Sequence, residues 1–279
     1  MGSQRLILVD GSGYIFRAFY ALPPMSREDG TPVNAVFGFT SMLLKLSEDM
    51  EGENILVVFD AARTTFRNAI YKEYKANRSE PPEELVPQFD LIKKATTAIG
   101  LKSLEVENYE ADDIIATYVK IAKKENIETL VISSDKDLMQ LIQDGVSLYD
   151  PMKNIKIGPE AVLEKFGVSP DKVIDVQALA GDSSDNVPGV PGIGVKTASQ
   201  LINEYGSLEK LLDNANSIKQ EKRRESLLNN AELAIVSKKL VSLFSDVPIP
   251  YKISDLKWTP RNDDNLLAFL KENNFKRLE

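Results

Sequence analysis

Three short apolar runs that each end in an aspartate constrain the fold of this chain more than any other feature. They are Leu6–Asp10, Ile55–Asp60 and Leu130–Asp135. Apolar runs of this length are typical of strands that are buried on both faces of a parallel sheet. Helical stretches at about 35–50 and 112–125 lie between them, which gives the β-α-β alternation of an α/β domain. We therefore predict a twisted, mostly parallel sheet flanked by helices.

The carboxyl ends of parallel strands meet at one edge of a sheet, where ligands bind in such folds. Asp10, Asp60 and Asp135 should therefore converge. The chain brings further carboxylates to similar positions, in an acidic tetrapeptide at 110–113 and in pairs near 136 and 183, the last pair spaced to share a helical face. The predicted cluster has nine members: Asp10, Asp60, Glu110, Asp112, Asp113, Asp135, Asp137, Asp182 and Asp185.

Nine clustered carboxylates require neutralisation. Two carboxylates ~4 Å apart repel by about 4 kcal/mol at an effective dielectric of 20. Either several of them are protonated through raised pKa values, or divalent cations bind among them. The chain has no histidine and no cysteine. An all-oxygen site favours Mg²⁺ or Mn²⁺ over zinc.

The net charge of the chain is consistent with such a site. The chain has 42 acidic and 34 basic residues and a net charge of −8. Without the nine members of the predicted cluster, 33 acidic residues remain against the 34 basic ones. The acidity of the chain is therefore largely that of the predicted site, and it does not exclude an anionic partner.

The tetrapeptide Glu110-Ala111-Asp112-Asp113 also has a purely structural interpretation, because acidic residues favour the first turn of a helix. In a regular helix Glu110 and Asp112 would point ~200° apart. If both serve metal ions, the backbone at Ala111 must be extended and the helix must begin near Asp112. Asp113 is then the member most easily explained as a helix-start residue.

The segment 63–78 is basic and contains interleaved tyrosines. At helical spacing, one face would carry Arg67, Tyr71, Lys75 and Arg78. A solvated helix face explains this pattern, but so does a surface that grips a phosphodiester backbone and stacks a base. Pro81-Pro82 ends the segment, so we expect a projecting helical lobe.

A Pro-Gly-Ile-Gly turn at 191–194 opens an amphipathic stretch and resembles a helix-hairpin-helix element. It is not a nucleotide-binding loop, because Val195 separates Gly194 from Lys196 and no strand precedes it. Main-chain N–H groups at such a helix start can face phosphates without reading bases. A plain structural turn between helices is the alternative.

Five motifs in order along the chain resemble those of the 5′ nuclease domains of bacterial DNA polymerases of the first type and of the wider flap endonuclease superfamily. They are VDGSGYIFRAFYA, VVFDAARTTFR with YKEYKANR, YEADDIIAT, ISSDKDLMQL and GDSSDNVPGVPGIGVKTA. The resemblance implies one 5′ nuclease domain over residues 1–279 with a PIN-like fold. It also implies a helical arch at 64–87 and a helix-three-turn-helix DNA-binding region at 182–230.

The resemblance also implies roles for individual residues. The acidic cluster would hold metal ions, although the role of Asp113 is less settled in the family. Lys75 and Arg78 would be catalytic basic residues, with Arg67 in support. A K⁺ ion would bind at the turn between Val190 and Ile193. DNA contacts would come from Arg17, Tyr71, Gly192, Gly194, Lys196 and Thr197.

The activity implied by the resemblance is hydrolysis of DNA near free 5′ ends in replication, repair and primer removal, with Mg²⁺ or Mn²⁺ as cofactor. The partners would be DNA with a 5′ flap, nick or overhang and a linked polymerase domain, in the bacterial cytoplasm at the nucleoid and without a membrane partner. Two other classes stay open. One is a catalytically silent, structure-specific DNA-binding protein. The other is a small-molecule phosphatase, although Asp10-Gly11-Ser12 lacks the second aspartate that an aspartyl-phosphate enzyme needs. An RNA-directed PIN nuclease is a closer alternative, disfavoured by the hairpin element.

Overall fold

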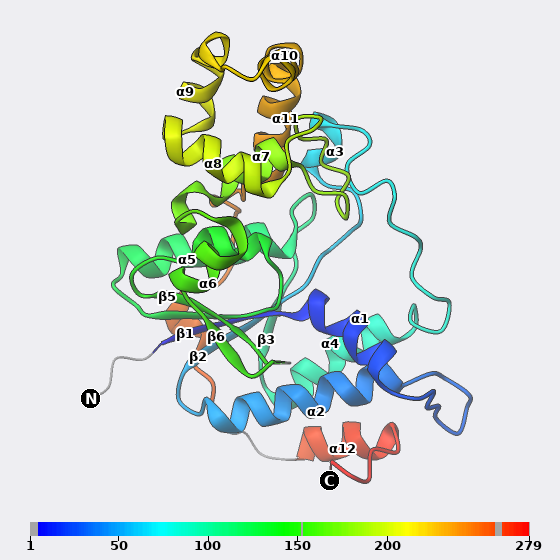
Figure 1. Ribbon diagram of the computed structural model, residues 1–279. Coiled ribbons are helices and arrows are strands. Elements are labelled where there is room, and N and C mark those ends of the chain that lie inside the picture. The colour runs from blue at the N-terminus through cyan, green and yellow to red at the C-terminus, as the bar shows by residue number, and fades with distance from the viewer. Residues whose placement is uncertain (1–4, 152, 260–263, 279) are drawn as a thin grey trace. The chain divides into compact units, whose positions relative to one another are not determined.

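The computed structural model describes residues 5–151, 153–259 and 264–278. The chain folds into two compact units (Figure 1). Unit 1 combines residues 1–61, 80–134 and 245–279, and unit 2 combines residues 62–79 and 135–244. The chain therefore leaves unit 1 and returns to it twice, and the acidic residues predicted to form one cluster are divided between the two units.

Unit 1 is built on parallel strands in the order β3-β2-β1-β4. These are β1 (Leu6–Asp10), β2 (Asn54–Val58), β3 (Lys102–Leu104) and β4 (Thr129–Ile132). Every residue of β1 and β2 is buried, as expected of strands covered on both faces. The predicted parallel α/β arrangement is confirmed. Only Asp10 lies within its strand, however, because Asp60 and Asp135 follow the ends of β2 and β4 by two and three residues.

Helices cover both faces of this sheet. Figure 1 shows α5 on one side, and α2 and α4 on the other. The predicted helices at 35–50 and 112–125 are confirmed as α2 and α5. The helical elements of unit 1 are α1 (Gly11–Ala21), α2 (Asn34–Asp49), α4 (Gln88–Ile99), α5 (Ala111–Lys124), the 3₁₀ turn η4 (Ile253–Leu256) and α12 (Asp264–Glu272).

Unit 2 is mainly helical, and α7 packs against α8, α9 and α11. An antiparallel pair, β5 (Val146–Asp150) with β6 (Ile155–Ile157), precedes the helices α6 and α7. The helical elements of unit 2 are α3 (Phe66–Ile70), η1 (Asp137–Leu141), α6 (Pro159–Phe166), η2 (Pro170–Lys172), α7 (Val173–Ala180), α8 (Val195–Tyr205), α9 (Leu208–Asp213), η3 (Ala215–Ser217), α10 (Glu221–Asn229) and α11 (Ala231–Val241).

The continuous helix predicted over residues 63–78 is wrong. Helix α3 ends at Ile70, and residues 72–77 form successive turns. Lys75 has a φ of +55°, in the left-handed region, which a regular helix cannot contain. The side chains of Arg67, Tyr71, Lys75 and Arg78 therefore do not share one helical face. The segment proposed as a helical arch is mostly non-helical in this structure.

The helical face predicted for Asp182 and Asp185 is also wrong. The two residues belong to a closed turn in which Asp182 and Val187 exchange both main-chain hydrogen bonds, at 3.0 and 2.8 Å. The turn begins directly after Gly181, at the end of α7. Asp182 and Asp185 therefore have positions set by a tight turn rather than by helical spacing.

Among the described residues, no helix has both the length and the apolar character needed to cross a membrane.

Candidate active site

In unit 1, Asp10 connects the end of β1 with the start of α1. Its carboxylate accepts hydrogen bonds from the N–H of Gly13 at 3.0 Å and from the hydroxyl of Ser133 at 2.7 Å. The close approach depends on glycine, because a Cβ at position 13 would lie 2.6 Å from Asp10 Oδ2. Asp10 is therefore buried and oriented by neutral donors at the carboxyl end of the sheet.

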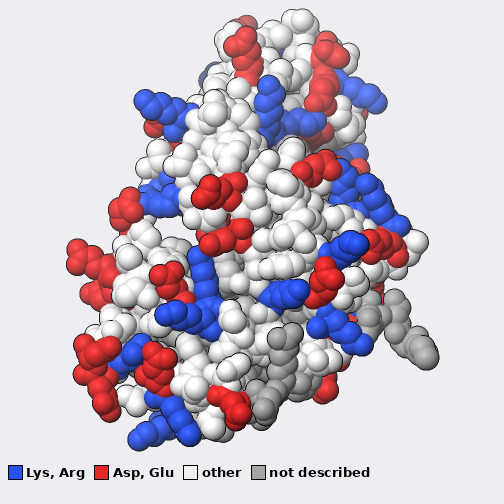
Figure 2. All heavy atoms as spheres, turned by 180° about the vertical axis from the view of Figure 1, so that it is seen from behind, with Lys and Arg blue, Asp and Glu red and all other residues white. Residues whose placement is uncertain are grey.

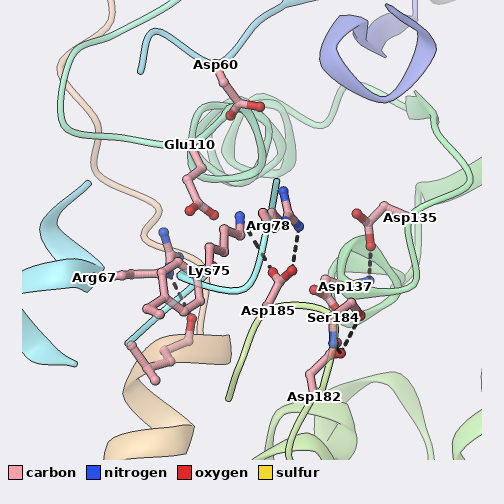
Figure 3. Close-up of polar contacts among 12 residues, drawn as sticks. Asp60, Arg67, Lys75, Arg78, Glu110, Asp135, Asp137, Asp182, Ser184 and Asp185 are labelled. Atoms are coloured by element: carbon pink, nitrogen blue, oxygen red, sulfur yellow. Dashed lines mark hydrogen bonds and ion pairs between the residues drawn. The ribbon is translucent and has the colours of Figure 1, made fainter. Parts of the chain in front are cut away.

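Asp60 and Glu110 lie near the start of α5 (Figure 3). Asp60 Oδ1 accepts a hydrogen bond from the N–H of Ala111 at 2.7 Å. The main-chain N–H of Asp60 donates to the hydroxyl of Ser12 at 2.9 Å. Asp60 is itself exposed, whereas Glu110 is buried. The hydrogen bond from Ala111 thus links the segment after β2 to the first turn of α5.

The acidic start of α5 differs by one residue from the predicted arrangement. The extended residue is Glu110, with φ −88° and ψ 158°, and the helix begins at Ala111. Asp113 is fully buried, and its Oδ2 accepts a hydrogen bond from the N–H of Glu110 at 3.1 Å, as one half of a capping box. The interpretation of Asp113 as a helix-start residue therefore has direct structural support, and Asp112 lies half-exposed in the first turn.

In unit 2, Asp137 is the first residue of η1, and Asp135 lies two residues before it. Asp135 Oδ1 accepts a hydrogen bond from the N–H of Asp137 at 2.8 Å (Figure 3). Asp137 Oδ1 accepts one from Nε2 of Gln177 at 2.6 Å. Burial, and then the charge of Asp135, raise the pKa of Asp137 to about 7, with smaller contributions from Asp185 and Asp182. The predicted mutual repulsion of the carboxylates is therefore present among these four residues.

Asp182 is neutralised by a basic residue that sequence reasoning missed. Nζ of Lys136 lies 2.6 Å from Asp182 Oδ2. Asp182 Oδ1 accepts a hydrogen bond from the N–H of Ser184 at 2.9 Å and another from its hydroxyl at 2.5 Å. Burial raises the pKa of Asp182, but the hydrogen bonds from Lys136 and Ser184 outweigh burial and leave it lowered. The position of Lys136 between two site aspartates was the available signal.

Asp185 is the shared ion-pair partner of Lys75 and Arg78, the two basic residues predicted to be catalytic. Nζ of Lys75 lies 3.6 Å from Asp185 Oδ2, and the guanidinium of Arg78 forms an ion pair with Oδ1 (Figure 3). The main-chain N–H of Lys75 also donates to the Asp185 carbonyl at 2.9 Å. Side-chain amides of Asn77 and Asn186 tie the same two loops together at 2.7 and 2.6 Å. Lys75 and Arg78 thus reach the acidic site from turns, not from a helix face.

Arg67 does not lie with them. Its side chain is 1% exposed, and it donates to the carbonyls of Leu240 at 2.8 Å and Ser242 at 3.1 Å. Tyr71, predicted on the same face, is partly buried against a cluster that contains Tyr74 and Leu240. The predicted exposed basic face is therefore wrong for Arg67 and Tyr71, which pack within unit 2 in this structure.

The predicted DNA-contacting turn is open. Gly192 has a φ of +80°, and a Cβ at Gly192 or Gly194 would meet nothing within 4 Å. Gly194 precedes α8 without a side-chain cap, and Lys196 is exposed in the first turn beside half-exposed Thr197. The unpaired first N–H groups of a helix suit an anion. In unit 1, Arg17 on α1 donates to the hydroxyl of Ser134 at 2.7 Å.

The donor chemistry of these residues fits a hard divalent cation, because every candidate ligand is a carboxylate. Within the described part of the chain, however, no three acidic side chains are already grouped closely enough to hold one. Asp182 and Asp185 are instead paired with Lys136, Lys75 and Arg78. The residues therefore fit the metal in kind, and metal binding would require these ion pairs to rearrange.

Sequence profiles establish the family. The profile of the 5′-3′ exonuclease N-terminal resolvase-like domain matches residues 5–167, more than half of the chain. This chain belongs to the 5′-3′ exonuclease family. The profile of the C-terminal domain of that family, described as a SAM fold, matches residues 168–264. Both profiles together cover residues 5–264, so the family assignment indicated by the motifs holds over almost the whole chain.

Curated relatives are much longer than this chain. DNA polymerase I of Rhizobium leguminosarum is 52% identical over 283 residues, which cover 99% of this chain and 28% of that protein. DNA polymerase I of Bacillus subtilis is 41% identical over 279 residues, which cover 99% of this chain and 32% of that protein. The chain thus spans about a third of the length of these relatives.

Solved structures share the fold. A bacteriophage T5 5′-exonuclease with bound zinc ions has a TM-score of 0.73 at 24% identity, covering 96% of this chain and 98% of that one. A bacteriophage T5 flap endonuclease variant in a complex with DNA and metal ions has a TM-score of 0.71 at 25% identity, covering 86% and 90%. The catalytic core of Rad2 in complex with DNA substrate has a TM-score of 0.65 at 16% identity, covering 97% and 88%. The predicted PIN-like nuclease fold is confirmed.

Proposed function

We propose that this nuclease hydrolyses DNA phosphodiesters near a free 5′ end, at flaps, nicks or overhangs, with two Mg²⁺ ions as cofactors. The observation that carries the proposal is the group formed by Asp135, Asp137, Asp182 and Asp185 with two basic side chains from another loop of unit 2. In a 5′-3′ exonuclease, all-oxygen ligands beside cationic side chains suit a metal-bound phosphodiester. The DNA and metal ions named for the T5 flap endonuclease complex support the same proposal.

Asp135, Asp137, Asp182 and Asp185 of unit 2 would hold the metal ions, whereas Asp113 would serve the α5 cap. Bound in this way, a pair of ions supplies a hydroxide from water at neutral pH and charge stabilisation for the leaving oxygen. The chain has no histidine to act as the general base, so this role would fall to the metal centre. Mn²⁺ should substitute for Mg²⁺, because it accepts the same oxygen ligands.

Lys75 and Arg78 would leave Asp185 and bind the non-bridging oxygens of the scissile phosphate, where negative charge develops. The exchange would be electrostatically balanced, because Asp185 would then be a metal ligand and the two basic side chains would face the phosphate instead. The chain therefore neutralises its own carboxylates before DNA and metal are bound. Arg67 would hold α3 against α11 and stay out of the reaction.

The turn at 190–197 would hold the duplex by its phosphates, with main-chain N–H groups near Gly192 and Gly194 and the side chains of Lys196 and Thr197. A K⁺ ion at the carbonyls between Val190 and Ile193 would add positive charge there. Such contacts favour DNA of a given structure over a given sequence. Figure 2 shows one face of the molecule with Lys and Arg interspersed among Asp and Glu, so on that face binding would rest on local groups and not on a uniformly basic surface.

The relatives support a wider setting for the activity. As part of a protein with a polymerase domain, this nuclease would remove primers and damaged 5′ strands on chromosomal DNA in the bacterial cytoplasm. Arg17 on α1 and Tyr71 would approach the DNA near the reacting phosphate, after Tyr71 shifts from its packed position.

The decisive experiment is incubation of the chain with a 5′-flap duplex, with Mg²⁺ and separately with EDTA. We expect cleavage near the base of the flap only with Mg²⁺. Cleavage that survives EDTA would contradict the two-metal proposal. Tight flap binding without cleavage at any divalent metal would identify a silent DNA-binding protein, and hydrolysis of a chromogenic phosphomonoester alone would identify a phosphatase.

A further inference from the structure

Gln177 is a buried polar residue that the proposed reaction does not use. It lies on α7 with 3% of its surface exposed. Its Nε2 donates to Asp137 Oδ1 at 2.6 Å, whereas its Oε1 has no hydrogen-bond partner in the described part of the chain. A buried amide that leaves its acceptor unsatisfied carries a free-energy cost. Its donor is therefore the functional end of the side chain.

The partner of Asp137 differs in kind from the partners of its neighbours. Asp182 and Asp185 form ion pairs with Lys136, Lys75 and Arg78. Gln177 is neutral. A cation beside a carboxylate cancels its charge and competes with a metal ion, but an amide orients the carboxylate and leaves its charge intact. Unlike Asp182 and Asp185, Asp137 can therefore be reached by a metal ion without displacement of a basic side chain.

The engaged oxygen also sets the direction of the free one. Oδ1 of Asp137 is held by Gln177, and Oδ2 makes no hydrogen bond or ion pair with any described residue. Residues that hydrogen-bond to a ligating carboxylate fix its orientation and tune its affinity for the metal. The position of Gln177 on the buried side of α7 makes this orientation part of the packing of unit 2.

We propose that Gln177 is a positioning residue that orients Asp137 through Oδ1 and thereby presents Oδ2 to a divalent cation. The proposal rests on the metal centre of the proposed function and adds a residue that acts on the metal only through Asp137. No motif that carries the resemblance contains Gln177, since YEADDIIAT and ISSDKDLMQL precede it and GDSSDN begins four residues later.

The test measures Mn²⁺ binding to the DNA-free chain by isothermal titration calorimetry, so it does not depend on cleavage. Gln177→Met keeps the length and apolar volume of the side chain but removes the donor. We expect the Mn²⁺ dissociation constant to rise about 10-fold, the lower end of the range for residues that support a metal ligand. An unchanged dissociation constant would overturn the proposal.

A double-mutant cycle separates positioning from general loosening of the unit. In an Asp137→Asn background, Gln177→Met should change the Mn²⁺ dissociation constant less than about twofold, because the residue through which it acts is gone. An equal 10-fold effect in both backgrounds would contradict an action through Asp137.

Gln88 provides a matched control. It is a fully buried glutamine of unit 1 whose Nε2 donates to Asn34 Oδ1 at 2.9 Å. Gln88→Met should lower the Tm while leaving Mn²⁺ binding unchanged. If Gln88→Met also weakened Mn²⁺ binding 10-fold, the effect of Gln177→Met would be due to destabilisation and the proposal would fail. Absence of Mn²⁺ binding by the wild-type chain would overturn the proposed metal centre itself, whereas normal binding by Gln177→Met overturns only the role of Gln177.

Discussion

The two units hold their acidic residues in different ways. In unit 1, Asp10 and Asp60 accept hydrogen bonds from main-chain N–H groups, and Asp10 also from the Ser133 hydroxyl. In unit 2, Asp182 and Asp185 are paired with lysine and arginine side chains. Neutral main-chain donors orient a carboxylate and leave its charge for a metal ion, whereas cations must be displaced first. The comparison indicates that a metal ion on Asp182 or Asp185 must displace a basic side chain, whereas the main-chain donors to Asp10 and Asp60 add no positive charge to them.

The largest expected effect comes from breaking the exchange in unit 2. Asp185→Ala removes the residue that joins the acidic group to Lys75 and Arg78. We expect single-turnover cleavage of a 5′-flap duplex to fall about 10³-fold, with flap affinity nearly unchanged, because the loss concerns transition-state charge. Asp171→Ala, an exposed aspartate on η2, is the control and should cleave normally. Cleavage by Asp185→Ala within about tenfold of wild type would contradict this role.

Variants of Arg67 and Lys75 test whether these two residues of unit 2 serve stability or catalysis. Arg67→Met should lower the free energy of unfolding by about 3 kcal/mol, since the buried carbonyl of Leu240 and the half-buried carbonyl of Ser242 lose their donor. Lys75→Met should leave stability nearly unchanged and reduce single-turnover cleavage about 10²-fold. Chemical denaturation and quenched-flow cleavage measure the two effects. A folded Arg67→Met variant with a 10²-fold loss of rate would restore its predicted catalytic role.

The pH dependence of stability tests the repulsion in unit 2. The pKa of Asp137 is about 7 in the folded chain, raised by burial and then by Asp135. Its protonated form is favoured by folding, so metal-free protein should lose stability as the pH rises from about 4 to about 7. Asp137→Asn should abolish the loss of stability that comes from Asp137. In the wild-type protein, saturating Mg²⁺ should make stability rise with pH instead. Tm measured against pH, with EDTA and with Mg²⁺, checks the sign. A wild-type Tm that rises between pH 4 and pH 7 in EDTA, relative to the Tm of Asp137→Asn, would contradict the raised pKa of Asp137.

The smallest effect concerns Lys136. Its Nζ forms an ion pair with Asp182. Burial lowers the pKa of Lys136, but the interaction with Asp182 outweighs burial, so the pKa is raised. Lys136→Met removes this competing cation. We expect Mn²⁺ to bind about threefold more tightly, the size of a partly exposed ion pair. Weaker Mn²⁺ binding by Lys136→Met would show that the lysine organises the site.

Much of unit 1 could be predicted locally. The parallel strands follow from short apolar runs, and Asp10, Asp60 and the start of α5 follow from the strand–loop–helix order. The start of α5 was predicted one residue too late. Residue propensities do not fix the exact end of a helix, so they could not decide whether Glu110 or Ala111 is the last extended residue. Asp113 was correctly singled out as the helix-start residue.

Unit 2 could be predicted in composition but not in geometry. Lys75, Arg78, Asp182 and Asp185 were all singled out, but both helical faces assigned to them are turns. Contacts between loops over 100 residues apart, such as Lys75 with Asp185, override weak local helix propensity. Gln177 gave no signal, because a glutamine on an otherwise apolar helix acquires a role only when α7 places it beside Asp137.

By itself, the amino-acid sequence determined the α/β class and the family and singled out the acidic and basic candidates for the site, because strand burial and motif order are local properties of the chain. Only the tertiary structure decided which carboxylates have neutral donors and which have cations, that Arg67 is buried, and that Gln177 holds Asp137. The physical reason is that partner choice depends on distances between segments far apart in the chain, and those distances exist only after packing.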